Sequence, residues 1–184
     1  KSKIEAAFIG TETFVSLVNI RDIQVLIAGM AFNPGLYTLN GNSNALHALS
    51  MAGGISEDGS YRNIDIIRDD KVIASIDLYD LFIYGKSTFG PRLRSGDSIF
   101  IRPASILVNI ATGVKRPAEY ELQPSETFGD LIDFANGLSD YADTSYLAVE
   151  RVDGKKINLI KYPGIESLSK SKAISGDTLF IREF

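Results

Sequence analysis

Short runs of apolar residues, separated by turn-forming residues, predict a hairpin followed by a helix near the start of the chain. The run 25–28 is apolar and largely β-branched, and 36–39 alternates behind the turn signal Pro34-Gly35. Between 45 and 52, alanine and leucine recur at helical spacing, after an Asn-Ser-Asn stretch that offers N-caps and before Gly53-Gly54. We therefore expect two paired strands and then one helix.

The next residues predict a second hairpin, a short helical turn and a final strand. Residues 64–68 and 71–76 are expected to be strands on either side of the turn Asp69-Asp70, and Asp77 is placed to cap a helical turn. Gly96-Asp97 then turns the chain into a strand over 98–102. This order is typical of a mixed sheet with one main helix packed across it, an α+β fold of the β-grasp type.

The same pattern occurs a second time in the chain. Residues 95–102 recur as 175–182 with six of eight positions identical, and upstream matches follow at a shift of 83 residues. We expect two domains, 23–103 and 104–184, behind a leader, 1–22. The leader alternates weakly over 14–20, which is expected to be either a strand paired with a neighbouring domain or a disordered tail.

The second copy carries its own signals for the helix and the hairpin. Thr127 and Asp130 have the spacing of a capping box at the start of the second helix. Asp153-Gly154 predicts a two-residue hairpin turn. The two copies therefore predict the same element order independently.

The composition excludes several classes of protein. The 184 residues include no cysteine, which excludes disulfides and Cys-ligated zinc. A net charge of −4, from 19 basic and 23 acidic residues, argues against a nucleic-acid partner. The longest apolar run, 25–32, is much shorter than the about 20 residues of a membrane-spanning helix, so no transmembrane segment is expected. Because the chain starts at Lys1 without a signal peptide or lipid-anchor cysteine, we expect it to be an excised piece or a processed product.

At these positions the sequence resembles the soluble-ligand-binding β-grasp (SLBB) domain. The motifs are Pro-Gly-x-Tyr-x-Leu at 34–39, Ala-Gly-Gly-Ile at 52–55, Asp-Leu-x-x-Leu at 77–81 and Leu-Arg-x-Gly-Asp-x-Ile-x-Ile at 93–101. The second copy departs from the pattern at Ala118, at Asn136 and over 161–174, which lacks a clear Asp-Leu-x-x-Leu segment, so we expect it to be divergent. The positions expected to be structural are Pro34, Gly35, Tyr37, Gly53, Gly54, Gly96, Asp97, Pro117, Tyr120, Gly137, Gly176 and Asp177.

Tandem copies of this domain are similar to the periplasmic part of outer-membrane polysaccharide export proteins, which serve capsule and exopolysaccharide secretion. The resemblance implies a scaffold or channel wall that is not an enzyme and uses no cofactor. It implies a homo-oligomeric ring that carries polysaccharide, with an inner-membrane polysaccharide co-polymerase as partner. It also implies a periplasmic location, attached to the outer membrane in the full-length protein. Two alternatives stay open: a module that binds a small soluble ligand, and a carbohydrate-active enzyme.

The residues that could take part in catalysis or metal binding have a structural interpretation as well. Asp97 and Asp177 could suggest a carboxylate pair for glycoside hydrolysis, but they stand at equivalent turns of different copies, where an aspartate commonly fixes its own turn. His47 is the single histidine, so no triad or multi-histidine metal site forms around it, and we expect it to face solvent. Neither a catalytic nor a metal site is predicted.

Aromatic residues supply the remaining candidates. Tyr37 and Tyr120 match between the copies, as do Phe100 and Phe180, and this equivalence favours core or sheet packing. Aromatic residues in the less regular segments of the first copy could instead stack on sugars or fill an interface, although packing over the domain's own core is an equal alternative. Our candidates for carbohydrate or interface contacts are Tyr61, Arg62, Tyr84, Phe89, Arg92 and Arg94.

Overall fold

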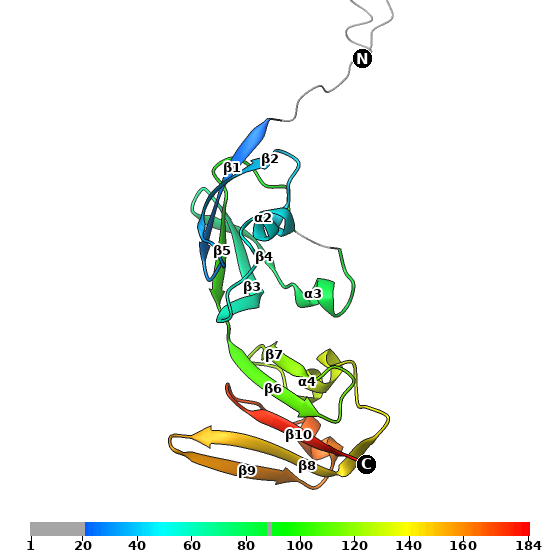
Figure 1. Ribbon diagram of the computed structural model, residues 1–184. Helices are drawn as coiled ribbons and strands as arrows, with labels where there is room; N and C mark the ends of the chain where they lie inside the picture. Colours follow the sequence, from blue (N-terminus) through cyan, green and yellow to red (C-terminus); the bar gives the residue numbers. More distant parts are fainter. Residues whose placement is uncertain (1–20, 88–89) are drawn as a thin grey trace, which may run out of the picture.

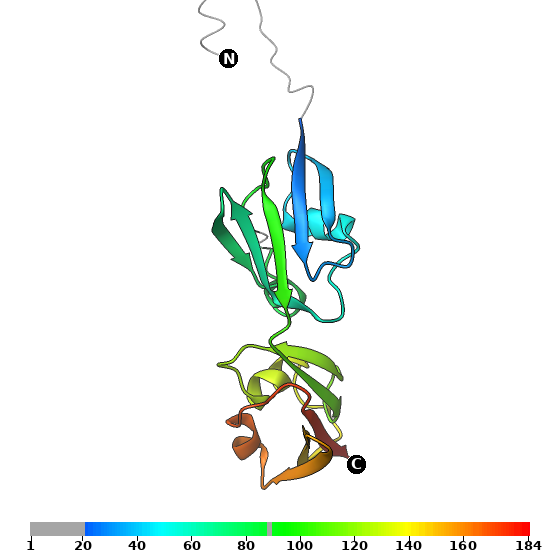
Figure 2. The ribbon, with the colours of Figure 1, turned by 90° about the vertical axis from the view of Figure 1, so that its left-hand side faces the viewer.

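The computed structural model describes residues 21–87 and 90–184, and it contains two five-stranded sheets that follow each other along the chain (Figure 1). We call the elements β1 to β5 the first module and β6 to β10 the second module. The two modules lie end to end, so the molecule is elongated (Figure 2). The strand considered for 14–20 lies outside the described residues.

The first module has the element order expected from the sequence. Its sheet runs β2-β1-β5-β3-β4, with β1 and β5 parallel and the other neighbours antiparallel. The positive φ angles of Asp69 and Asp70, 48° and 59°, form the tight turn between β3 and β4. The elements are β1 (Asp22–Gly29), β2 (Gly35–Asn40), α2 (Ala45–Met51), β3 (Gly59–Arg68), β4 (Lys71–Ile76), α3 (Tyr79–Phe82) and β5 (Ser98–Pro103).

The second module repeats this topology, with the order β7-β6-β10-β8-β9. Two details differ from the expectation. Asp153 pairs with Lys156, so the hairpin turn is Gly154-Lys155, one residue later than predicted. A short helix with buried Leu168 forms although the sequence motif for it is missing. The elements are β6 (Ile106–Thr112), β7 (Ala118–Leu122), α4 (Phe128–Phe134), β8 (Ala142–Asp153), β9 (Lys156–Tyr162), α5 (Ile165–Ser169) and β10 (Thr178–Glu183).

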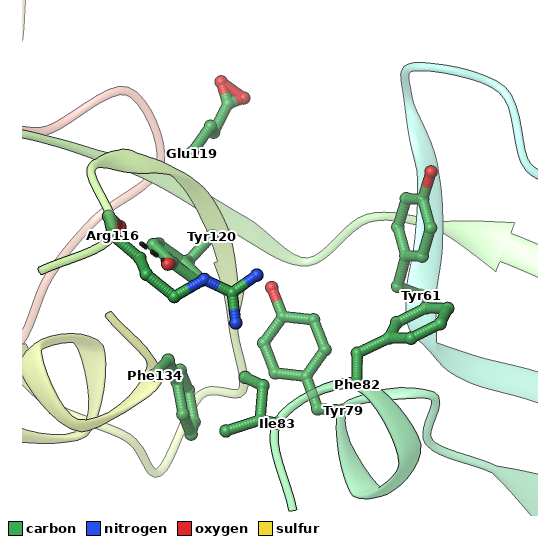
Figure 3. A pocket seen from close by; sticks show the side chains of 8 residues that line it. All are labelled: Tyr61, Tyr79, Phe82, Ile83, Arg116, Glu119, Tyr120 and Phe134. Carbon is green, nitrogen blue, oxygen red and sulfur yellow. Dashed lines mark hydrogen bonds between the residues drawn. The ribbon is translucent and has the colours of Figure 1, made fainter. Parts of the chain in front are cut away.

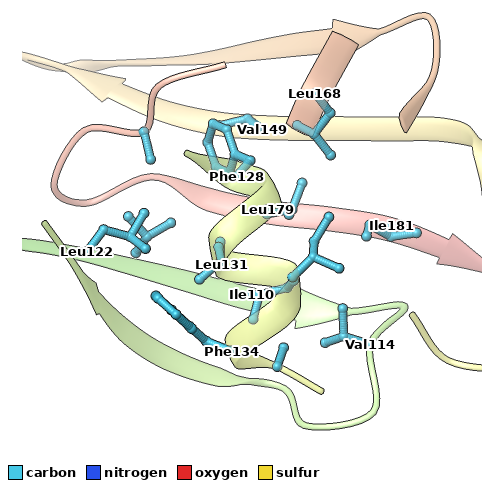
Figure 4. Close-up of a cluster of buried hydrophobic side chains, with 14 of the residues drawn as sticks. Ile110, Val114, Leu122, Phe128, Leu131, Phe134, Val149, Leu168, Leu179 and Ile181 are labelled. Carbon is cyan, nitrogen blue, oxygen red and sulfur yellow. The ribbon is translucent and has the colours of Figure 1, made fainter. Parts of the chain in front are cut away.

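Each module has its own apolar core between the sheet and its main helix. Alternate residues of the strands point toward the helix, as the period of two requires, and Ile27, Ile66 and Ile99 of the first module are fully buried. Figure 4 shows the second core, where Phe128 and Leu131 of α4 pack over Ile110 and Leu179. The helices start where the sequence predicts, because Asn44 and Thr127 are N-caps whose side chains bond the third helical residue.

The repeated Gly-Asp turns have the same hydrogen bonds in both modules. Asp97 accepts two bonds from the Arg68 guanidinium, both at 2.7 Å, and one from the backbone N–H of Arg94. Burial alone would raise the pKa of Asp97, but these bonds and the charge of Arg68 outweigh it and hold the pKa below its ordinary value. Asp177 is bound by Arg151 in the same way. Each aspartate is thus paired with the arginine of its own module.

The aromatic residues that match between the copies divide into two kinds. Tyr37 and Tyr120 pack against their cores, and each donates a hydroxyl hydrogen bond to the backbone carbonyl four residues before it, at 2.7 and 2.8 Å. Of the two roles expected for Phe100, core or sheet packing, the structure shows sheet packing, because its side of β5 faces solvent. Its ring covers Gly29, where an added Cβ would lie 3.1 Å from the ring. The atom nearest to that Cβ is the backbone carbonyl oxygen of Ile101, so the close approach of β1 to β5 requires glycine at this position.

Candidate functional site

A bulge at the start of β3 forms the contact between the two modules. Gly59 pairs with Pro103 and Ile64 pairs with Ile101, so residues 60–63 leave the ladder between β3 and β5. The freed backbone N–H groups find acceptors in side chains. The N–H of Tyr61 donates to Glu121 at 2.9 Å, and the N–H of Asn63 donates to the Ser60 hydroxyl at 2.7 Å. The bulge thus presents backbone donors to the second module.

Glu121, on β7 of the second module, is the acceptor for this bulge. Its side chain is buried, and its carboxylate accepts hydrogen bonds from the Ser60 hydroxyl at 2.7 Å and from the backbone N–H of Ser105 at 3.2 Å. Its own backbone N–H donates to the Tyr79 hydroxyl at 2.7 Å. A buried carboxylate is tolerated only when such bonds replace water. Glu121 therefore ties β7 to β3 and α3 at the junction.

Arg62 fills the space beside this carboxylate. Its guanidinium pairs with Asp77 of the first module at 3.0 Å and with Glu126 of the second module. It also lies 4.6 Å from the centre of the Tyr79 ring and 5.1 Å from that of Phe134. Burial alone would lower the pKa of Arg62, but the bonds and charges of Glu126 and Asp77 hold it above its ordinary value. Arg62 thus links carboxylates and rings from both modules.

The second module has a bulge at the equivalent place, but it is closed by the module itself. Arg182 pairs with Asp143 and Ile181 pairs with Leu147, so 144–146 leave the ladder. Asp143, which aligns with Ser60, accepts bonds from both the hydroxyl and the backbone N–H of Ser145. The bonds from Ser145 and Arg182 lower the pKa of Asp143 to about 2. Asp143 thus takes the place of the Ser60 hydroxyl, which accepts from the backbone N–H of Arg62 at 3.1 Å, and the second bulge is closed by a carboxylate of its own module.

A pocket of about 210 Å³ opens beside the junction (Figure 3). Tyr61 and Phe82 come from the first module, and Arg116 and Glu119 come from the second. Tyr79 and Phe134 also line the pocket and meet edge to face, with ring centres 5.2 Å apart. Burial raises the pKa of Tyr79 to about 12, so its hydroxyl stays protonated at neutral pH. Both modules are needed to form this pocket.

The six carbohydrate or interface candidates do not lie together. Tyr61 lines the pocket and Arg62 is buried at the junction, where it does not face solvent. Tyr84 is exposed beside Lys86, whose Nζ lies 5.4 Å from the centre of its ring. Arg92 and Arg94 are exposed near the Gly-Asp turn before β5, where their backbone groups bond Arg68 and Asp97. Phe89 lies outside the described residues.

Sequence reasoning missed Glu121, Glu126, Arg116 and Glu119. The signal that could have found the first of them is a difference between the copies, because Thr38 aligns with Glu121 and Asp143 aligns with Ser60. A polar position that changes its character between repeats can indicate a contact that only one repeat makes.

Over 21–87 and 90–184, no group of three histidine, aspartate or glutamate side chains is placed to hold a metal ion. His47 is exposed and its Nδ1 accepts from the backbone N–H of Asn44 at 3.5 Å, so it takes part in the cap of α2. No helix in the described ranges is long and apolar enough to span a membrane.

Comparison with known proteins gives a family and two relatives. The model of the SLBB domain matches residues 24–76 and 108–159. Two Escherichia coli proteins, each named polysialic acid transport protein KpsD, are 25% identical to this chain over 169 residues. The match covers 91% of this chain and 30% of each relative, so the chain spans less than a third of their length.

Proposed function

Because the chain belongs to the SLBB domain family, with two copies of the domain in tandem, we propose that it is the scaffold part of a polysaccharide export protein. The observation that carries this proposal is the tandem match, together with a likeness over 91% of the chain to proteins named for polysialic acid transport. The proposal covers the full-length protein, of which this chain is a part. Its polymer is a capsular or exopolysaccharide, and its place is the periplasm, attached to the outer membrane.

The junction between the modules supports a scaffold role. A channel wall must keep its domains in fixed positions while a hydrated polymer passes. Arg62 and Glu121 bind groups of both modules in a partly buried network, and polar networks whose members are all bonded favour one arrangement of the parts. We propose that the full-length protein assembles this rigid unit into a homo-oligomeric ring that meets an inner-membrane polysaccharide co-polymerase.

The carboxylates of the repeated turns support a role without catalysis. Asp97 and Asp177 are buried, at 1% exposure each, and each is paired with an arginine. A glycosidase needs two carboxyl groups that face the same glycosidic bond, one of them able to give up a proton. These two aspartates belong to different modules and are held as ion pairs, so they are suited to fixing turns.

Two measurements test the proposal in the full-length protein. Sedimentation of the detergent-solubilised protein is expected to give an oligomer, and a monomer at all concentrations would contradict the ring. Incubation with the exported polymer is expected to leave its chain length unchanged. Shortening of the polymer that Asp97→Asn or Asp177→Asn abolishes would contradict the scaffold role and favour an enzyme.

A further inference from the structure

We propose that the pocket at the junction binds one carboxylate-bearing sugar residue of a polysaccharide chain. This inference rests on the proposed function, because it names the chemical class of the polymer that contacts this part of the protein. The pocket is lined by aromatic rings from both modules and by two charged groups from the second (Figure 3). The rings are Tyr61, Tyr79 and Phe82 of the first module and Tyr120 and Phe134 of the second, and the charged groups are Arg116 and Glu119. Such a combination of apolar walls with a few polar groups is typical of ligand sites.

The aromatic walls offer a surface for the apolar face of a pyranose ring. Tyr61 is 40% exposed and Phe82 is 54% exposed, although both are large rings that would gain from being covered. Their ring centres are 6.5 Å apart and the rings are tilted by 59°, so they form an angled wall rather than a closed stack. A rigid ring with C–H groups on one face is a ligand that could cover this wall.

The charged groups select a carboxylate. The Arg116 side chain is exposed at the rim, and within 21–87 and 90–184 it has no carboxylate in ion-pair distance. A guanidinium binds a carboxylate through two parallel hydrogen bonds. Figure 3 shows the Arg116 guanidinium pointing toward the Tyr79 ring, whereas the Glu119 carboxylate points away from the other side chains at the edge of the pocket. The Tyr79 hydroxyl accepts from Glu121 and keeps its own hydrogen for a ligand oxygen.

The size and surroundings of the pocket favour a polymer over a separate small molecule. Its volume of about 210 Å³ is below the about 300–1,000 Å³ of pockets that enclose drug-sized ligands. A second hollow of about 160 Å³ beside α2 shares Tyr61 and Phe82 with it, and its other walls include Leu46 and Leu49. Two adjacent hollows with a common aromatic wall suit consecutive sugar units of one chain.

The test is a titration of the purified 184-residue chain with oligosaccharides, followed by NMR amide shifts and calorimetry. The probes are tetramers of sialic acid and of galacturonic acid, which carry carboxylates, and maltotetraose, which does not. We expect the acidic tetramers to shift amides near Tyr61, Phe82 and Arg116, and to bind more tightly than maltotetraose. Arg116→Gln should weaken the acidic tetramers about tenfold or more, which is the effect of losing hydrogen bonds to a charged group.

Two further variants test the aromatic wall and control for the loss of a charge. Phe82→Ala should weaken every tetramer that binds, and Arg21→Gln, which removes an exposed charge just before β1 and away from the pocket, should leave binding unchanged. Thermal unfolding checks that each variant is folded, which is expected for Arg116→Gln because the bonds that hold Arg116 in place come from its backbone. Absence of binding by both acidic tetramers, or an Arg116→Gln variant that binds as the wild type does, would overturn the proposal.

The results distinguish a failure of the sugar site from a failure of the proposed function. If the tetramers do not bind while the full-length protein still forms an oligomer and supports export, the sugar site is wrong and the scaffold role stands. If the tetramers bind but the full-length protein is a monomer and is not needed for export, the scaffold role is wrong.

Discussion

Arg62→Met is the perturbation that tests the junction between the modules most strongly. The Arg62 side chain is 9% exposed and pairs with Asp77 and Glu126, whose side chains are 31% and 18% exposed. Methionine keeps part of the apolar stem but removes the charge, the hydrogen bonds and the contacts with the rings of Tyr79 and Phe134. The two carboxylates are then left without their shared partner.

The size of the effect follows from these exposures. Removing one partner of a fully buried ion pair costs about 3–5 kcal/mol, whereas an exposed pair contributes about 0–1 kcal/mol. The carboxylates at the junction retain some contact with water, which reduces the cost, and the lost contacts of a cation with two rings add about 1 kcal/mol. We expect the free energy of unfolding to fall by about 3 kcal/mol.

Urea unfolding followed by circular dichroism measures this change, and Lys86→Gln is the matched control. Lys86 pairs with Asp80, but the two side chains are 58% and 43% exposed, so removing this charge should leave the free energy of unfolding nearly unchanged. Small-angle X-ray scattering should also show a broader range of shapes for Arg62→Met, because the modules lose their shared contact. An unfolding free energy within about 0.5 kcal/mol of the wild type, with unchanged scattering, would refute the reasoning.

Three further predictions concern single groups. Asp97→Asn should lower the melting temperature, with a loss of about 2–4 kcal/mol, because the Arg68 guanidinium loses its charged acceptor; an unchanged melting temperature would contradict this. Asp143 has a folded-state pKa of about 2, below its ordinary 3.8. Its contribution to the stability of the folded state is therefore complete above about pH 4 and is lost as the pH falls toward 2. Acid unfolding of the wild type and of Asp143→Asn checks this prediction, because the variant should lack this part of the pH dependence of stability. Tyr79 has a pKa raised from 10.0 to about 12, so folding favours its neutral form and stability should fall as the pH rises from about 10 to 12. Tyr79→Phe should not show that loss, and an equal loss in the variant would assign it to other groups.

Local signals in the sequence were sufficient to predict the fold of each module. Apolar periodicity, caps and turn residues act over a few positions, and the repeat supplied each signal twice, as with the caps Asn44 and Thr127. The sequence was insufficient where pairing with neighbouring strands determines the position of a residue. The match of Phe100 with Phe180 leaves core and sheet packing open, and only the register of β5 shows that its ring packs on the outer face of the sheet over Gly29. The second hairpin turns one residue later than its Asp-Gly pair suggested, because pairing along β8 and β9 sets the register.

The junction could not be predicted in the same way, because its contacts join residues far apart in sequence. Ser60 and Glu121 are separated by 61 positions, and neither carries a motif. The residue types of Tyr61 and Arg62, and their position in an irregular segment, make them candidates in the sequence. Only the structure places Tyr61 at the pocket and Arg62 in the polar network of the junction. Arg116 carries no motif of its own, and its place at the pocket depends on Tyr61 and Phe82 of the other module.

The most direct test of the central claim is the amount of polysaccharide on the surface of cells whose only copy of the full-length protein lacks residues 21–184. Cells that carry the complete protein at the same level are the control. The scaffold role predicts that polymer disappears from the surface of the deletion strain and accumulates inside the cell. Undiminished surface polysaccharide, with the shortened protein present at its normal level, would contradict the account.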